Sequence, residues 1–217
     1  MLLKEAAALL SRFWRGFGRL GERGPADGPP LMVIPGFLAT DRTTLGLQRA
    51  FAEAGYRVAG WGLGFNRGAR EDTVERLVRQ LEHFAQGRKV VLVGWSLGGL
   101  YARELAKARP ELVEKVVTLA SPFSGDPHNN NVWRLYELVA GHPVDKPPID
   151  GDPAAKPPVP TLAIWSRNDG IVAPAAARGK PGERDAEQEL DCGHMGFAVG
   201  GRCYPRIVEA VRNFASS

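Results

Sequence analysis

One run of residues constrains the fold of this 217-residue chain more than any other. Residues 89–93, Lys-Val-Val-Leu-Val, are mostly β-branched and apolar, as is typical of a strand covered on both faces. The motif Gly-Trp-Ser-Leu-Gly follows directly at 94–98, and residues 98–108 have the pattern of a helix. A buried strand that turns through a glycine-flanked serine into a helix favours a sheet with helices packed on it.

The rest of the chain continues this alternation of short apolar runs and longer amphipathic ones. The apolar runs predict further strands at residues 31–34, 57–61, 116–120, 160–165 and 187–190. The amphipathic runs predict helices at residues 43–54, 72–86, 98–108 and 205–214. Strands that alternate with helices pair in parallel through right-handed crossovers. We therefore predict an α/β fold, a doubly wound, mostly parallel sheet of about six strands with helices on both faces.

Two segments depart from this alternation. Residues 2–20 carry apolar side chains at helical spacing and predict an amphipathic helix, followed by a linker rich in glycine and proline. That helix can pack on the domain, which is the commoner case, or lie on a lipid surface. Residues 121–160 carry several prolines and predict a small insertion with one helix at 131–140. We therefore divide the chain into a helix and linker at 1–30 and one domain at 31–217.

Charge and composition argue against several classes of protein. The net charge is +4, but the basic residues are scattered, so we expect no nucleic acid partner. No apolar run approaches the roughly 20 residues of a membrane-spanning helix, and no clear signal cleavage site follows the N-terminus. We expect a cytoplasmic protein, with peripheral membrane contact through the N-terminal helix left open.

The two cysteines, Cys192 and Cys203, are too few for a structural zinc site. They could form one disulfide, but we favour a reduced pair.

Ser96 has the setting of a catalytic nucleophile. Glycines on both sides permit a tight turn where side chains would clash. The turn exposes the serine at the carboxyl end of its strand, where open parallel sheets bind their ligands. A serine hydroxyl is a poor nucleophile until a positioned base takes its proton.

His194 is the predicted base, because it lies between the last predicted strand and the last helix, at the same edge of the sheet as Ser96. His83 falls within a helix, and His128 and His142 flank the insertion helix. A base of this kind needs a carboxylate that orients it and stabilises its protonated form.

Asp169 is the predicted acid, because it follows the strand predicted at 160–165 and so lies at that edge too. The chain order Ser96, Asp169, His194 is the one that hydrolases with this kind of serine turn use. Asp126, after the strand at 116–120, and Asp191, close to His194, are rival acids.

Backbone N–H groups near Ser96 predict an oxyanion hole. The N–H of Leu97 follows the nucleophile, and that of Phe37 lies in the loop after the first strand, where Gly36 lets the chain turn inward. The predicted walls of the substrate pocket are apolar or aromatic: Leu38, Trp95, Trp133, Tyr136 and Met195.

Taken together, these segments resemble the α/β-hydrolase superfamily, and within it the lipase- and esterase-like members, over residues 31–214. The motifs are Gly-x-Ser-x-Gly at 94–98, the acid loop at 169, Gly-His at 193–194, and Ser-Pro-Phe-Ser-Gly at 121–125. The last is similar to a Ser/Thr-Pro-x-x-Gly stretch of many bacterial lipases. The chain departs from the superfamily in carrying Pro35-Gly36 where His-Gly is frequent, and in lacking the usual first antiparallel strands.

The resemblance implies a carboxylic ester hydrolase that works through an acyl-enzyme, with no metal or organic cofactor. Its partner would be a small-molecule or lipid-like ester. The same three residues would also suit a thioesterase, an acyltransferase or a cofactor-free perhydrolase. An alternative of another class is a catalytically silent hydrolase fold that acts as a binding or membrane-associated module.

Overall fold

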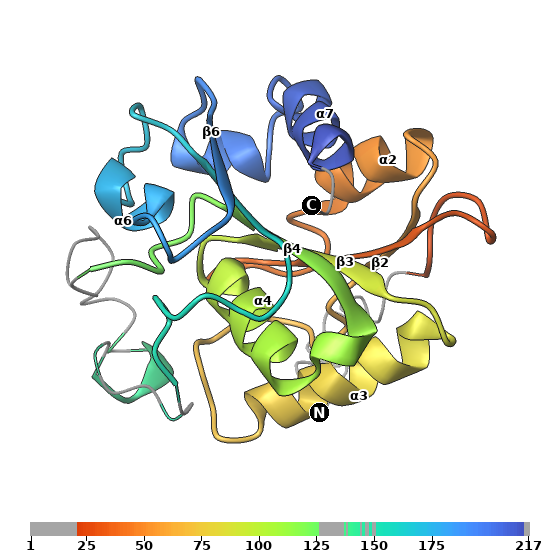
Figure 1. Cartoon of the computed structure of the whole chain (residues 1–217), viewed down its shortest axis with the longest axis horizontal. Helices are drawn as coiled ribbons and strands as arrows, with labels where there is room; N and C mark the ends of the chain where they lie inside the picture. Colours follow the sequence, from red (N-terminus) through yellow and green to blue (C-terminus); the bar gives the residue numbers. More distant parts are fainter. Residues whose placement is uncertain are drawn as a thin grey trace, which may run out of the picture.

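Six parallel strands form the sheet at the centre of the molecule (Figure 1). The computed structural model describes residues 21–125, 137, 139–143, 145, 148 and 151–214. The strands lie in the order β2-β1-β3-β4-β5-β6, which confirms the predicted parallel sheet. Their bounds are β1 Pro30–Ile34, β2 Arg57–Gly60, β3 Val90–Trp95, β4 Val113–Leu119, β5 Thr161–Trp165 and β6 Ala186–Glu189.

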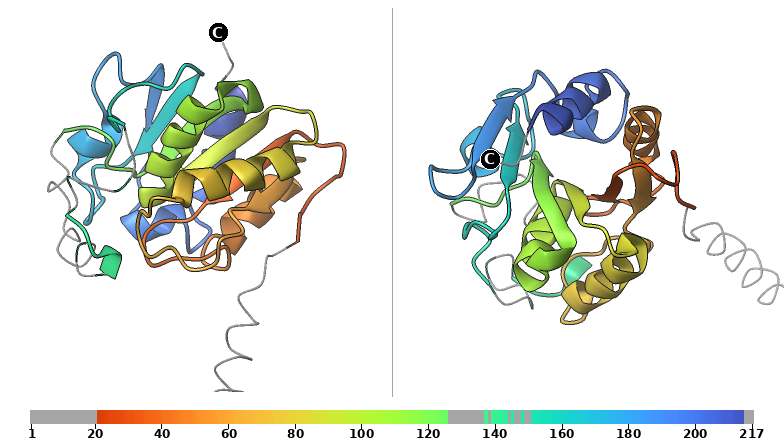
Figure 2. Two further views of the ribbon diagram at one scale, coloured as in Figure 1. Left: turned by 90° about the horizontal axis from the view of Figure 1, so that it is seen from below. Right: turned by 45° about the vertical axis from the view of Figure 1, so that its right-hand side comes forward.

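Helices cover both faces of the sheet, as the alternating pattern predicts (Figures 1 and 2). On one face lie α2 (Leu45–Glu53) and α7 (Tyr204–Asn213), and on the other α3 (Thr73–Ala85) and α4 (Leu97–Ala108). Successive side chains of a strand point to opposite faces. Val91 and Val93 of β3 therefore pack with the α2 and α7 side chains, whereas Leu92 packs with those of α3 and α4.

Three short elements were not predicted from the sequence. They are α6 (Pro174–Arg178) and the 3₁₀ turns η1 (Pro110–Leu112) and η2 (His194–Phe197). Each is 3 to 5 residues long, too short for a hydrophobic period to show in the sequence.

The predicted N-terminal helix at 2–20 lies outside the described residues, as does most of the insertion helix at 131–140. Membrane contact through the first of them stays a prediction. Part of the predicted linker joins the sheet, because Arg23 and Val58 of β2 exchange backbone hydrogen bonds of 2.9 and 2.8 Å in an isolated antiparallel bridge. Within the described ranges, no helix is both long and apolar enough to cross a membrane.

The strand order places one crevice of the sheet between β1 and β3. From β1 the chain continues to β2 on one side of β1, and then crosses to β3 on the other side of β1. The loops that leave the carboxyl ends of β1 and β3 therefore diverge to opposite faces. Open α/β sheets bind their ligands at such a switch point.

Candidate active site

Ser96 occupies a strained turn between β3 and α4. Its backbone angles are φ 54° and ψ −123°, a conformation that non-glycine residues rarely adopt. The Ser96 N–H donates to the Leu119 carbonyl of β4 at 2.8 Å, which ties the turn to the sheet. A β-carbon on Gly94 would lie 2.2 Å from the Gly98 oxygen, and one on Gly98 would lie 2.2 Å from the Ile34 oxygen. Both flanking glycines are therefore required by the close approach of backbone to backbone.

His194 and Asp169 form a buried pair. The Nδ1 atom of His194 lies 2.8 Å from Oδ2 of Asp169, and their side chains are 6% and 1% exposed. The other carboxylate oxygen, Oδ1, accepts the N–H groups of Ile171 at 2.8 Å and Val172 at 2.9 Å. Because a carboxylate only accepts, Nδ1 carries the proton of this bond. Nε2 is then the nitrogen that can take a proton from a nucleophile.

The rival side chains do not pair with His194 in the described part of the chain. Asp191 is exposed, and its Oδ1 accepts a hydrogen bond from Asn168 Nδ2 at 2.7 Å. His83 is exposed on α3, and both ring nitrogens of His142 lie 3.0 Å from backbone carbonyls. Asp126 and His128 lie outside the described residues.

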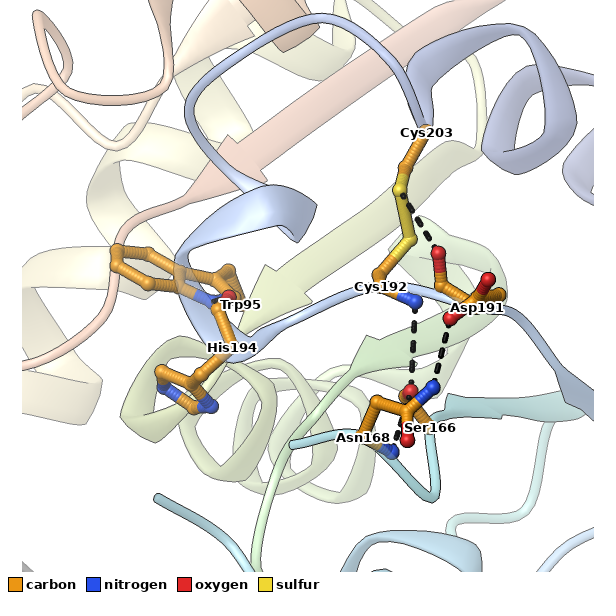
Figure 3. Close-up of a disulfide and its surroundings, with 7 residues drawn as sticks. All are labelled: Trp95, Ser166, Asn168, Asp191, Cys192, His194 and Cys203. Carbon is orange, nitrogen blue, oxygen red and sulfur yellow. Dashed lines mark hydrogen bonds between the residues drawn. A yellow bond between two sulfur atoms is a disulfide. The ribbon is translucent and has the colours of Figure 1, made fainter. Parts of the chain in front are cut away.

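Trp95 connects the loop of His194 with the turn of Ser96. The indole N–H donates to the His194 carbonyl at 3.1 Å, and the two rings lie 5.4 Å apart between centroids (Figure 3). Trp95 immediately precedes Ser96, so this contact brings the loop against the end of β3. Trp95 is only 3% exposed, so the histidine loop is held against a buried side chain. Its predicted role as a pocket wall stays a prediction.

The loop after β1, in which we predicted an oxyanion donor, lies against the serine turn. A β-carbon on Gly36 would be 3.0 Å from the β-carbon of Ser96. Leu97 is the first residue of α4, so its N–H has no carbonyl partner within the helix. Phe37 follows Gly36 and is half-buried.

Asn66 holds this loop in place and was not identified from the sequence. Its Nδ2 donates to the Pro35 carbonyl at 2.9 Å. Its backbone N–H donates to the Ala39 carbonyl at 2.9 Å, and its own carbonyl accepts the Leu38 N–H at 2.8 Å. The side chain is fully buried. The only signal in the sequence is its place in the glycine-rich loop after β2, at the same sheet edge as Ser96.

Cys192 and Cys203 form a disulfide, so the prediction of a reduced pair is wrong (Figure 3). The segment between them turns back through η2 and through Gly200 and Gly201, both of which have positive φ. This reversal brings the two Cα atoms to 6.5 Å, within the range that a disulfide spans.

Four predicted residues of the substrate pocket remain, two of them on exposed loops and two outside the described residues. Leu38 and Met195 are exposed, on the loop after β1 and on η2. Trp133 and Tyr136 lie outside the described residues. Among the residues that the structure describes, no three His, Cys, Asp or Glu side chains gather as they would around a metal ion.

Comparisons of the sequence find a family model and two curated relatives. A family model described as alpha/beta hydrolase fold matches residues 29–142. Over 126 residues the chain is 31% identical to the pimeloyl-[acyl-carrier protein] methyl ester esterase of Nitrosospira multiformis, covering 52% of this chain and 46% of that protein. Over 60 residues it is 38% identical to the biotin biosynthesis bifunctional protein BioHC of Teredinibacter turnerae, covering 28% and 10%. The chain thus spans less than half the length of these curated relatives.

Solved structures share the fold at low sequence identity. A structure from the work on LipS and LipT, two metagenome-derived lipolytic enzymes, has a TM-score of 0.65 at 19% identity, covering 92% of this chain and 97% of that one. A lipase-esterase related protein of Clostridium acetobutylicum has a TM-score of 0.65 at 15% identity, covering 90% and 98%. The thioesterase domain from the curacin biosynthetic pathway has a TM-score of 0.61 at 12% identity, covering 88% and 94%.

Proposed function

The chain belongs to the alpha/beta hydrolase fold family, and we propose that it is a carboxylic ester hydrolase with Ser96 as its nucleophile. The observation that carries this proposal is the buried pair of His194 and Asp169, 2.8 Å apart. The loop of this pair is joined to the strained serine turn through Trp95. Strained backbone concentrates at functional sites.

The proposed reaction proceeds through an acyl-enzyme. Ser96 Oγ attacks the ester carbonyl carbon while His194 Nε2 takes the hydroxyl proton, and Asp169 stabilises the resulting imidazolium. The N–H groups of Leu97 and Phe37 donate to the oxyanion of the tetrahedral intermediate. His194 then protonates the departing alcohol, and water, deprotonated by His194, releases the acid from Ser96. These steps use no metal or organic cofactor.

The proposed substrate is a small-molecule or lipid-like ester. Leu38 and Met195 present exposed apolar side chains on the two loops that carry the proposed oxyanion donor and the base. The names of the relatives and structural neighbours include a methyl ester esterase, lipolytic enzymes and a thioesterase domain. A thioester therefore belongs in the substrate panel as the nearest alternative.

A fluorophosphonate probe tests the nucleophile. We expect a covalent adduct on the intact protein, and its loss together with ester hydrolysis in Ser96→Ala. Ser216→Ala is the matched control, since this serine follows α7 in the sequence, apart from every motif of the proposed site, and it should label at the rate of the unmodified chain. An adduct that persists in Ser96→Ala, or no adduct on the intact protein, would overturn the proposal.

A panel of nitrophenyl esters of increasing acyl length, with acyl thioesters alongside, tests the substrate class. We expect kcat/KM to be highest on an oxygen ester. If every thioester surpassed its matching ester, the assignment to carboxylic esters would be wrong even though Ser96 were the nucleophile.

A further inference from the structure

The disulfide between Cys192 and Cys203 encloses His194. Cys192 stands two residues before His194, and Cys203 immediately precedes the first residue of α7. Their sequence separation is 11, so η2 lies inside a ring that the disulfide closes. We propose that this disulfide positions His194 for proton transfer with Ser96. The inference rests on the proposed hydrolase function and assigns the two cysteines a positioning role in it.

One side of the ring is fastened to the loop that carries Asp169 (Figure 3). The Cys192 N–H donates to Ser166 Oγ at 3.3 Å, and the same oxygen accepts the Asn168 N–H at 3.0 Å. Asn168 Nδ2 in turn donates to Asp191 Oδ1 at 2.7 Å. The loop after β5 and the loop after β6 are therefore joined beside the disulfide, so a fixed Cys192 also fixes His194 relative to the acid.

The other side of the ring is fastened to the body of the protein. Cys203 leads into α7, where the Tyr204 hydroxyl donates to the Ala198 carbonyl at 2.7 Å. Residues 199–202 between them are exposed and include Gly200 and Gly201. Without the disulfide, this glycine-containing stretch would be the covalent route from η2 to α7, and glycines add backbone freedom.

Once the disulfide is broken, non-covalent contacts alone would hold the start of the histidine loop, among them the bond from Asn168 to Asp191. Cys192 would keep N–H bonds to Ser166 Oγ and to the Leu190 carbonyl, and the preceding strand β6 is only half-buried. The Trp95 bond to the His194 carbonyl and the bond to Asp169 would then carry the positioning. A displacement of about 1 Å at a catalytic group can cost about 10²-fold in rate.

The disulfide is buried, which slows its reduction. Cys192 and Cys203 are 4% and 6% exposed, so a reductant reaches them poorly. Opening the bond requires a dithiol, which is oxidised to its own disulfide while its two electrons and two protons convert the cystine into two thiols. Once formed, the disulfide is therefore expected to persist.

The double variant Cys192→Ser/Cys203→Ser tests the proposal. We expect kcat for a nitrophenyl ester to fall about tenfold or more, with KM changed less than about twofold, because base position affects the transition state and not ground-state binding. Leu81→Ala is the matched control. Leu81 is fully buried on α3, on the opposite face of the sheet, so this variant loses stability but should keep kcat at temperatures where both variants are folded.

Hydrogen exchange and thiol counting give readouts that do not require activity. We expect amides of residues 193–202 to exchange at least about tenfold faster in the double variant. We also expect the unmodified protein, produced in an oxidising compartment, to take up no iodoacetamide in denaturant before reduction. Unchanged exchange there, unchanged kcat, or free thiols in protein produced in an oxidising compartment and purified without reductant would each overturn the proposal. Failure of the hydrolase assignment would show separately, as absence of the Ser96 adduct.

Discussion

Asp169 uses both of its carboxylate oxygens. One binds His194, and the other accepts the N–H groups of Ile171 and Val172. Buried polar groups in proteins are nearly always bonded, so this side chain stabilises its own loop and orients the base at once. Its two functions depend differently on charge, because backbone N–H groups can bond a neutral amide oxygen as well.

We therefore expect Asp169→Asn to preserve the fold but lower kcat by about 10³- to 10⁴-fold, since an amide does not stabilise the imidazolium and can hold the wrong tautomer. Steady-state hydrolysis of a nitrophenyl ester measures the loss, and circular dichroism checks the fold.

Asp191→Asn is the comparison that separates the two carboxylates. Its loss should be far smaller, because an asparagine oxygen can still accept the bond from Asn168. If Asp191→Asn were the more damaging change, Asp191 would have to be the acid.

The sequence placed Ser96, Asp169 and His194 at one edge, because each follows a recognisable strand and parallel strands end at one edge. The structure pairs Asp169 with His194, and the joint role of the three stays a proposal. Asn66 could not be identified in the same way. Its importance depends on bonds to Pro35 and to the backbone at 38–39, which lie about thirty residues away in the chain. The disulfide was missed because a separation of 11 residues says nothing about whether the chain turns back.

At the scale of the elements, α4 begins in close contact with the sheet. Gly94 lies near the end of β3, and Gly98 lies in the first turn of α4. A β-carbon on Gly98 would meet the Ile34 carbonyl of β1. The helix therefore begins directly against the sheet, which aims its first N–H groups at the serine turn. The strands and long helices were predictable because their periods extend over several residues, whereas α6, η1 and η2 have no such period.

We expect Gly98→Ala to push α4 away from β1, destabilising the protein by about 1–3 kcal/mol and lowering kcat at least about tenfold. Urea unfolding and ester hydrolysis measure the two effects. A β-carbon on Gly21 would meet nothing within 4 Å, so Gly21→Ala serves as the control and should change neither. Normal activity in Gly98→Ala would show that the close approach is dispensable.

At the scale of the whole molecule, Arg103 of α4 joins parts of the chain that are distant in sequence. Its fully buried guanidinium donates to the carbonyls of Pro153, Ala154 and Ala155, and to that of Glu183. It also lies 4.2 Å over the ring of Phe123. Burial lowers the pKa of Arg103 to about 10, so the group stays charged at neutral pH and keeps every donor.

Removal of this group leaves several carbonyls without a donor. We expect Arg103→Ala to lower the free energy of unfolding by about 3 kcal/mol or more, measured by urea denaturation. Arg109→Ala is the control variant. The ion pairs of Arg109 with Glu82 and Glu111 are on the surface, where such pairs contribute at most about 1 kcal/mol. Equal effects of the two variants would contradict a stabilising role for the buried arginine.

The disulfide around His194 also bears on how active protein must be produced. Glutathione and thioredoxin keep thiols reduced in most cytosols, whereas the bacterial periplasm and the cell exterior let disulfides form and persist. In the predicted cytoplasmic location the ring would therefore stay open. Protein expressed in a reducing host should therefore leave the cell with two thiols at residues 192 and 203. Two batches of equal purity can then differ in turnover because of their oxidation history alone.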